Sequence, residues 1–269
     1  MITNKIAVAI IVLVILGGAR NLVLGQDTAF NSTDESELIY FQSSSLFKCN
    51  IKLPAKYDQE KAHTLVIGLH GGGATPESFV KIWDKVEGVN FIYVAPQGPY
   101  PILFDELGNE WSLWSSPDLK IRERAGELIV IYISDLVEVL RKQFIIDDIY
   151  ISGFSQGAVY TYMCCLMNPK LFTGMLIFSG PGIFEPLGNF DGKFAPDWIK
   201  EKYLKTESNL RVFISHGVDD QAVNYKLGVK SNEILNSYGY DVTFHSFEGG
   251  HAIDTTSLHK ALQWINKEE

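Results

Sequence analysis

A serine placed between two glycines has the clearest chemical potential in this chain. Ser155 lies in the pattern Gly-x-Ser-x-Gly at 153–157, after the apolar run 149–151 and before a helix-like run at 158–168 that Pro169 ends. A serine on a sharp turn between a strand and a helix needs strained backbone angles, and flanking glycines leave room for it. The hydroxyl then stands exposed at the positive end of the helix. We expect Ser155 to be a nucleophile, although so short a pattern also occurs by chance.

A serine hydroxyl is a weak nucleophile at neutral pH and needs a neighbouring base that takes its proton. His251 follows the strand-like run 242–247 after two glycines, which allow a tight turn that returns the imidazole over the strand ends. A surface-loop histidine is the alternative interpretation. His70 and His216 also follow strand-like runs, but each lies in a His-Gly turn, and we expect both to support loops. His251 is therefore the expected base.

The base in turn needs a carboxylate that fixes its tautomer and stabilises the imidazolium. Asp219 and Asp220 lie side by side after the strand-like run 210–215, and Asp254 lies just beyond His251. Chemistry alone does not separate Asp219 from Asp220, and either can be a capping or turn aspartate. Asp254 is the third candidate.

The fourth requirement is a site for the charge that develops on the substrate. Attack on an acyl carbon places negative charge on its oxygen, which preorganised backbone N–H groups stabilise by about 3 kcal/mol per donor. One donor would be Gln156, the residue after the nucleophile, and the other would come from the three glycines at 71–73. These glycines follow a predicted buried strand, 64–69. The alternative interpretation is a flexible turn.

The elements that position these residues alternate between strands and helices. Apolar runs predict strands at 46–53, 64–69, 91–95, 149–151, 173–179, 210–215 and 242–247, and helical spacing predicts helices at 77–86, 123–144, 158–168, 225–238 and 257–267. This order predicts an α/β fold, with a doubly wound, mostly parallel sheet and helices on both faces. Alternating polarity in 46–53 predicts an antiparallel strand at the N-terminal edge. In such a sheet the functional groups gather beyond the carboxyl ends of the strands.

Two segments have no regular pattern. The first, 97–120, is a predicted loop that contains Trp111 and Trp114, and the second, 180–208, contains three prolines and Trp198. We expect 180–208 to be a cap insertion over the pocket. The three tryptophans are candidate pocket walls, and ordinary packing is the equal alternative.

The composition is that of a globular chain. Hydrophobic residues make up 46% of the 269 residues and charged residues 20%, with a formal net charge of −9. No run of Lys and Arg with interleaved aromatic residues occurs, which argues against a nucleic-acid partner. Cys49, Cys164 and Cys165 match no zinc site, and their odd number argues against dependence on disulfides, although a bridge from Cys49 stays open. We expect no metal and no cofactor.

The N-terminal 25 residues differ from the remainder. Lys5 precedes an apolar run at 6–16, small residues follow at 17–19, and Gly25 is a small residue at a plausible cleavage position. This pattern is typical of a secretory signal peptide, and the run is shorter than the roughly 18 to 20 residues that span a membrane. We expect secretion or periplasmic export, cleavage near Gly25 and no stable membrane anchor afterwards. The predicted organisation is a signal peptide at 1–25, a flexible leader at 26–36 and one α/β domain at 37–269.

Together these motifs resemble the α/β-hydrolase superfamily. Leu-His-Gly-Gly-Gly at 69–73, Gly-Phe-Ser-Gln-Gly at 153–157, His-Gly-Val-Asp-Asp at 216–220 and Gly-His at 250–251 follow its order. The serine motif and Ala-Pro-Gln-Gly-Pro at 95–99 are similar to the phospholipase/carboxylesterase branch, which includes acyl-protein thioesterases. Secreted esterases of the feruloyl-esterase and polyhydroxybutyrate-depolymerase kind are also similar. The resemblance covers about residues 45–267 and implies an α/β-hydrolase domain.

The resemblance also implies roles for single residues. Ser155 would be the nucleophile, His251 the base and Asp220 the acid, because Asp220 falls at the family's His-Gly-x-x-Asp position. The backbone N–H groups of Gly72 and Gln156 would form the oxyanion hole.

Two departures bear on the substrate. A signal peptide is foreign to the cytosolic thioesterases, and the insertion at 180–208 is longer than that branch would lead one to expect.

We therefore expect an exported serine carboxylesterase that forms an acyl-enzyme on Ser155. Its substrate would be a small-molecule or polysaccharide-linked ester with a short or aromatic acyl group. Lysophospholipase or acyl-thioesterase activity is one alternative. A serine peptidase of the prolyl-oligopeptidase type is another, but no propeller or other large domain precedes the predicted hydrolase. A non-catalytic hydrolase-like binding protein is the third, although such relatives usually lose a member of the triad.

Overall fold

The computed structural model describes residues 23–24, 40–41, 45–103, 107–112, 118–182, 201–205 and 209–267. The chain divides into two units, Met1–Leu46 and Phe47–Glu269. In the first unit, β1 (Val23–Leu24) pairs antiparallel with β2 (Tyr40–Phe41). The remainder of the predicted signal peptide and the predicted leader lie outside the described residues.

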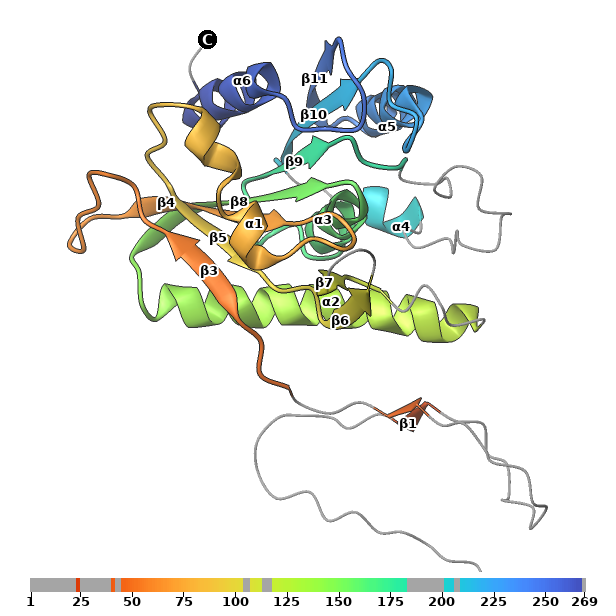
Figure 1. Ribbon diagram of the computed structural model, residues 1–269, viewed down its shortest axis with the longest axis horizontal. Helices are drawn as coiled ribbons and strands as arrows, with labels where there is room; N and C mark the ends of the chain where they lie inside the picture. Colours follow the sequence, from red (N-terminus) through yellow and green to blue (C-terminus); the bar gives the residue numbers. More distant parts are fainter. Residues whose placement is uncertain are drawn as a thin grey trace, which may run out of the picture. The chain divides into compact units, whose positions relative to one another are not determined.

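A seven-stranded sheet forms the centre of the second unit (Figure 1). Its strand order is β11-β10-β9-β8-β4-β5-β3, and every neighbouring pair is parallel except β3 and β5. This confirms the mostly parallel sheet with an antiparallel N-terminal edge. The strands are β3 (Cys49–Lys52), β4 (His63–Leu69), β5 (Ile92–Pro96), β8 (Ile146–Phe154), β9 (Gly174–Phe178), β10 (Arg211–Gly217) and β11 (Asp241–Phe247).

Helices cover both faces of this sheet. Along β4, Leu65 and Ile67 enter a core cluster that includes side chains of α2, α3 and α5, while Val66 enters a second cluster with η1 and α6. Both faces of the strand are buried, which is why its sequence is continuously apolar. The helices are α1 (Pro76–Phe79), the 3₁₀ helix η1 (Ile82–Lys85), α2 (Leu119–Arg141), α3 (Gln156–Met167), α4 (Glu201–Leu204), α5 (Tyr225–Ser237) and α6 (Thr255–Asn266).

The helix predicted at 77–86 is wrong, because two short helices, α1 and η1, occupy that stretch. A capping box between Thr75 and Ser78 starts α1, and the helix ends within one turn. The change of direction turns Trp83 into the core, where its ring packs edge-on against Phe91 with centroids 5.1 Å apart. Burial of this large aromatic side chain outweighs the helical preference of the local sequence.

The loop predicted at 97–120 is also wrong in part. It contains an antiparallel pair, β6 (Tyr100–Leu103) and β7 (Leu107–Glu110). Helix α2 begins at Leu119, earlier than predicted, because the Asp118 side chain accepts the N–H of Lys120 and caps it. The prolines and glycines in this stretch are typical of a loop, which is why the two short strands were not predicted.

Other expectations concern the edge strand, the cysteines and the two irregular segments. Ile51, at 40% exposure in β3, is more open to solvent than a half-buried strand predicts. All three cysteines are free thiols, and Cys164 and Cys165 lie in the core as expected. Trp114, Trp198 and most of 180–208 lie outside the described residues. None of the described helices has the length and apolar character that a membrane span requires.

Candidate active site

Ser155 lies on a strained turn between β8 and α3. Its backbone angles are φ 53° and ψ −117°, which is rare for a residue with a side chain and costs about 1–3 kcal/mol. The Ser155 N–H donates to the carbonyl of Phe178 in β9 at 3.1 Å, which fixes the turn to the sheet. The sequence pattern therefore forms the strand–turn–helix geometry expected of it, with the serine half-buried at its tip.

The two glycines of the serine motif permit close backbone contacts. A Cβ at Gly153 would lie 2.4 Å from the carbonyl oxygen of Gly157, and a Cβ at Gly157 would lie 2.1 Å from the carbonyl oxygen of Leu69. Because neither position has space for a side chain, the first turn of α3 packs directly on the carboxyl end of β4. This contact brings the glycine run after β4 to the serine turn.

The glycine run contributes backbone N–H groups of two kinds. Gly73 N donates to the carbonyl of Asn109 in β7 at 2.8 Å and is therefore engaged. In the part of the chain that the structure describes, the N–H groups of Gly71 and Gly72 donate to no acceptor. Only these two members of the predicted 71–73 run thus remain available to a ligand.

Gly71 and Gly72, whose N–H groups remain available, lie against the serine turn. A Cβ at Gly71 would lie 3.6 Å from the Cβ of Ser155, and a Cβ at Gly72 would lie 3.4 Å from Oε1 of Gln156. The structure therefore brings together the residues predicted as nucleophile and oxyanion donors.

A buried tryptophan joins the two segments that carry these donors. Trp111 is 0% exposed; its backbone N–H donates to Oε1 of Gln156 at 3.0 Å, and its indole Nε1 donates to the carbonyl of His70 at 2.8 Å. Of the two interpretations given to Trp111, packing is therefore correct. This link cannot be seen in the sequence, because nothing in the spacing of Trp111 and Gln156 indicates that they meet.

His70 supports the glycine run, as predicted. Its Nε2 accepts the N–H of Gly98 at 3.1 Å, so Nδ1 carries the proton and donates to the carbonyl of Gly71 at 2.8 Å. Burial lowers the pKa of His70 below its usual 6.5, which keeps the ring neutral and preserves this arrangement of donor and acceptor.

The predicted base and one predicted acid form a direct pair. His251 Nδ1 lies 2.8 Å from Oδ2 of Asp220, whose side chain is fully buried, whereas Asp219 is exposed. Oδ1 of Asp220 accepts the backbone N–H groups of Ala222 at 2.9 Å and Val223 at 2.8 Å. Geometry and burial thus separate the two adjacent aspartates that residue chemistry left open.

The third candidate acid has a different place. Asp254 is the N-cap of α6 and accepts the backbone N–H groups of Ser257 at 2.9 Å and Thr256 at 3.3 Å. Burial raises the pKa of Asp254, but the hydrogen bonds from Ser257 and Thr256 together outweigh it and lower the pKa below its usual value. Asp254 is a helix cap, and within the described residues no hydrogen bond or ion pair joins it to His251.

The loops after β10 and β11 pack closely, which is what brings the acid to the base. A Cβ at Gly217 would lie 2.4 Å from the carbonyl oxygens of both Gly249 and Gly250. The backbone N–H of Asp219 also donates to the carbonyl of Gly249 at 2.9 Å. The two glycines before His251 therefore provide the close turn that the sequence indicated.

His251 stands beside the serine turn. Its ring lies against the ring of Phe154, with centroids 4.8 Å apart and an angle of 34° between the planes. The side chain is 23% exposed, so solvent and ligands reach it. Within the described residues, neither Ser155 Oγ nor His251 Nε2 forms a hydrogen bond. A hydrogen bond therefore joins the acid to the base. The base lies beside the nucleophile because its ring contacts Phe154, the residue before Ser155.

His216, predicted to support a loop, also contacts the acid. It is 0% exposed, and its Nε2 lies 2.9 Å from the carbonyl of Val223 and 3.3 Å from Oδ2 of Asp220. The sequence places His216 at a predicted strand end, but its contact with Asp220 was not predicted. The four-residue spacing in His-Gly-x-x-Asp, across a tight turn, was the signal that could have done so.

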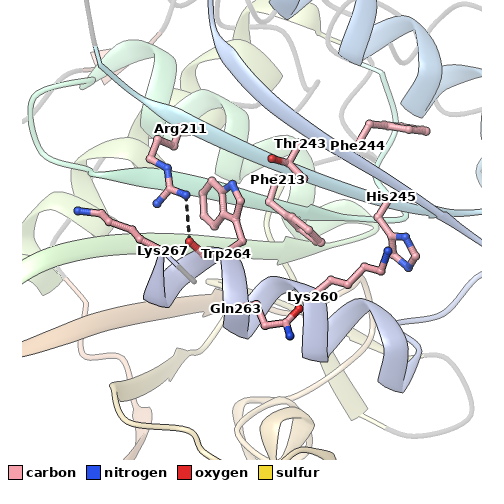
Figure 2. Close-up of a pocket in the computed structure, with 9 residues that line it drawn as sticks. All are labelled: Arg211, Phe213, Thr243, Phe244, His245, Lys260, Gln263, Trp264 and Lys267. Atoms are coloured by element: carbon pink, nitrogen blue, oxygen red, sulfur yellow. Dashed lines mark hydrogen bonds between the residues drawn. The ribbon is translucent and has the colours of Figure 1, made fainter. Parts of the chain in front are cut away.

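A separate cavity of about 620 Å³ lies between α6 and the last two strands (Figure 2). Arg211, the first residue of β10, crosses it: its Nη2 donates to the Trp264 carbonyl at 3.0 Å, and its guanidinium lies 4.3 Å from the Trp264 ring centroid. The cavity lining follows β10 and β11 from Arg211 to His245, and neither Ser155 nor His251 belongs to it. Among the described residues, no group of three or more His, Cys, Asp or Glu side chains is placed to hold a metal ion.

Comparisons with known proteins find a matching family and several similar proteins. A family described as phospholipase/carboxylesterase matches residues 55–269. A probable carboxylesterase SOBER1-like of Arabidopsis thaliana is 27% identical over 218 residues, covering 77% of this chain and 79% of that protein. Acyl-protein thioesterase 1 of Yarrowia lipolytica is 25% identical, covering 81% of this chain and 96% of that protein. Among solved structures, esterase PE8 is similar with a TM-score of 0.64 and 22% identity, covering 83% of this chain and 99% of that one.

Proposed function

The chain belongs to the phospholipase/carboxylesterase family, and we propose that it hydrolyses carboxylic esters through Ser155, His251 and Asp220. Its class of activity, carboxylic ester hydrolysis, follows from the family and from relatives named as carboxylesterases. The roles of the three residues are our proposal. The observation that carries it is the 2.8 Å hydrogen bond between His251 and the buried Asp220, beside the strained turn of Ser155.

In the first half of the reaction, Ser155 Oγ attacks the carbonyl carbon of the ester, and His251 Nε2 takes the hydroxyl proton. The negative charge on the carbonyl oxygen is stabilised by the backbone N–H groups of Gly72 and Gln156. Asp220 stabilises the imidazolium through Nδ1. The intermediate then collapses: the carbon–oxygen bond to the alcohol breaks, His251 returns the proton to that oxygen, and the acyl group stays on Ser155.

In the second half, water attacks the acyl-enzyme. His251 takes a proton from the water, the oxyanion forms again in the same place, and the bond to Ser155 Oγ breaks. The proton returns to Ser155, and the carboxylic acid leaves. Every step uses groups of this chain and one water molecule.

We propose a short-chain or aromatic oxygen ester, of a small molecule or linked to a polysaccharide, as the substrate. Support comes from the resemblance to secreted esterases and from the long insertion at 180–208. A thioester is the second candidate, since an acyl-protein thioesterase is similar to this chain over 96% of its own length. The same residues would serve both reactions, because only the leaving atom changes from oxygen to sulfur.

We also propose that the protein is exported. The support is the charge at Lys5, the apolar run 6–16 and the small residue Gly25. Expression in the native host, followed by N-terminal sequencing of protein from the medium or periplasm, tests this proposal. A mature chain that begins near Gln26 is the expected result, and protein that stays in the cytosol with Met1 or Ile2 at its terminus would contradict it.

Labelling with a fluorophosphonate tests the role of Ser155. We expect one adduct per chain, located at Ser155 by peptide mass spectrometry. In Ser155→Ala the label should disappear and kcat for p-nitrophenyl acetate should fall by at least about 10⁴-fold, with the fold intact by circular dichroism. Folded wild-type protein that takes up no label at Ser155 would overturn the proposed mechanism.

A substrate panel tests the acyl preference. It consists of p-nitrophenyl esters from acetate to palmitate, a feruloyl ester and an acyl-thioester of matched length, compared by kcat/KM. We expect the highest values for short-chain or feruloyl oxygen esters. A maximum on long-chain thioesters would instead assign the chain to the thioesterase reaction.

A further inference from the structure

The carboxylate of Asp220 receives donors on both of its oxygens. Oδ1 accepts the two backbone N–H groups of Ala222 and Val223, and Oδ2 accepts His251 Nδ1 at 2.8 Å. A second ring nitrogen, Nε2 of His216, lies 3.3 Å from the same Oδ2. Both side chains, His216 and Asp220, are 0% exposed, so water does not take the place of either group.

The hydrogen bonds of His216 define its protonation. Its Nε2 lies 2.9 Å from the carbonyl oxygen of Val223, which can only accept, so Nε2 carries the proton. This N–H donates to Val223 O, and Oδ2 of Asp220, 3.3 Å from the same nitrogen, is the second acceptor within its reach. Nδ1, on the other side of the ring, is buried and has no hydrogen-bond partner within the described residues.

The imidazole ring of His216 is also packed against helix α5. A Cβ at Gly228 of α5 would lie 2.6 Å from Nδ1 of His216, so the glycine leaves just enough room for the imidazole. Burial is the main reason that the pKa of His216 lies below its usual 6.5. At neutral pH the ring is uncharged, and it can donate to Asp220 without cancelling the negative charge that faces His251.

We propose that His216 is a positioning residue that holds Oδ2 of Asp220 where it receives Nδ1 of His251. The proposal rests on the proposed function, since it acts through the acid and the base of that mechanism. Without the His216 N–H, Oδ2 would keep only one donor, and the carboxylate would be free to rotate about its Cβ–Cγ bond. The imidazolium formed during catalysis would then be less well stabilised, while substrate binding would not change.

Two polar variants separate this role from a general structural one. In His216→Gln the amide N–H reaches the position of Nε2, whereas in His216→Asn the shorter side chain does not reach Asp220. Steady-state kinetics on p-nitrophenyl acetate would give kcat and KM for both variants, with folded protein measured by circular dichroism. Proton NMR would follow the downfield signal of the proton between His251 Nδ1 and Asp220. His259→Asn, at an exposed position of α6, is the matched control.

We expect kcat to fall about tenfold in His216→Asn with KM within twofold of the wild type, because a hydrogen bond to a charged group is lost. The downfield signal should shift or broaden. In His216→Gln both properties should return to within about threefold of the wild type and to its chemical shift. Equal kcat in the two variants, or an unchanged downfield signal in His216→Asn, would overturn the inference.

The wild-type protein separates failure of this inference from failure of the proposed function. If the wild type takes no fluorophosphonate at Ser155 and turns over no ester, the proposed function fails first. If the wild type is labelled and active while both His216 variants match it, only the role of His216 is wrong.

Discussion

Two halves of the candidate site are held in place by different means. The nucleophile half comprises residues 69–73, 109–111 and 153–157, and the acid–base half comprises residues 216–223 and 247–252. In the nucleophile half, backbones approach each other so closely that side chains are excluded, as at Gly157 against Leu69. The acid–base half has one such contact, at Gly217, but its acid is placed by hydrogen bonds that a buried carboxylate accepts from a side chain and the backbone.

This difference decides which substitutions each half tolerates. A site formed by close backbone contacts is sensitive to added side-chain volume, because no free space surrounds those contacts. A site built on side-chain hydrogen bonds is sensitive to loss of a donor or acceptor, even where the volume is conserved. Substitutions of matched size therefore test the acid–base half, and added methyl groups test the nucleophile half.

The largest effect is expected from Asp220→Asn. The change keeps the volume but removes the charge and the acceptor that fix the tautomer of His251, so kcat should fall by about 10⁴-fold. The matched control is Asp219→Asn, at an exposed neighbour, which should stay within twofold of the wild type. Comparison of kcat on p-nitrophenyl acetate checks both. Similar losses in the two variants would mean that burial misidentifies the acid.

The next largest effect, on stability, is expected from Gly157→Ala. The added Cβ would lie 2.1 Å from the Leu69 carbonyl, so β4 and α3 must separate, at a cost of about 3 kcal/mol. The thermal midpoint should fall by roughly 10 °C. Gly182→Ala is the control, because its Cβ would meet its nearest neighbour at an ordinary 3.5 Å. A midpoint for Gly157→Ala equal to that of the control would contradict close backbone packing.

Trp111→Phe removes the indole N–H that donates to the His70 carbonyl, one of the two bonds by which Trp111 joins the glycine run to the serine turn. The His70 carbonyl loses its bond, and the oxyanion donors become less well ordered, so we expect kcat to fall about tenfold with little change in KM. Trp83→Phe, at an equally buried position in the other core cluster, is the control. An increase in KM at constant kcat would instead make Trp111 a substrate-binding residue.

The smallest effect concerns pH and involves one imidazole of each half. Burial lowers the pKa of both His70 and His216 below 6.5, so as pH falls below that value the unfolded chain gains protons that the folded chain does not. The free energy of unfolding should therefore decrease below pH 6.5, by at most about 1.4 kcal/mol per pH unit for each ring. Urea unfolding between pH 7 and 5 measures this slope. Each His→Gln variant should have a shallower slope, and slopes equal to that of the wild type would show that these rings are not the cause.

The nucleophile half could be predicted from the sequence, because Gly-x-Ser-x-Gly at 153–157 and the three glycines at 71–73 each follow a predicted strand. The acid could not be chosen from its residue type, and only the family resemblance favoured Asp220 over Asp219; the structure shows that Asp220 is buried and bonded to His251. Trp111 directly follows the antiparallel pair β6–β7, whose short strands were not predicted, and its contact with Gln156 therefore was not predicted either. The contacts that only the structure shows are therefore those that depend on which side chain is buried.

The sequence distances within the two halves have a consequence for folding. The hydrogen bond between Asp220 and His251 closes a segment of 31 residues, whereas the bond from Ser152 to Ile67, next to the nucleophile half, joins residues 85 apart. The chain entropy lost on closing the longer segment is greater by about 0.9 kcal/mol. During refolding, the acid and the base can therefore find each other before the serine turn meets its oxyanion loop, and the return of activity reports the later event.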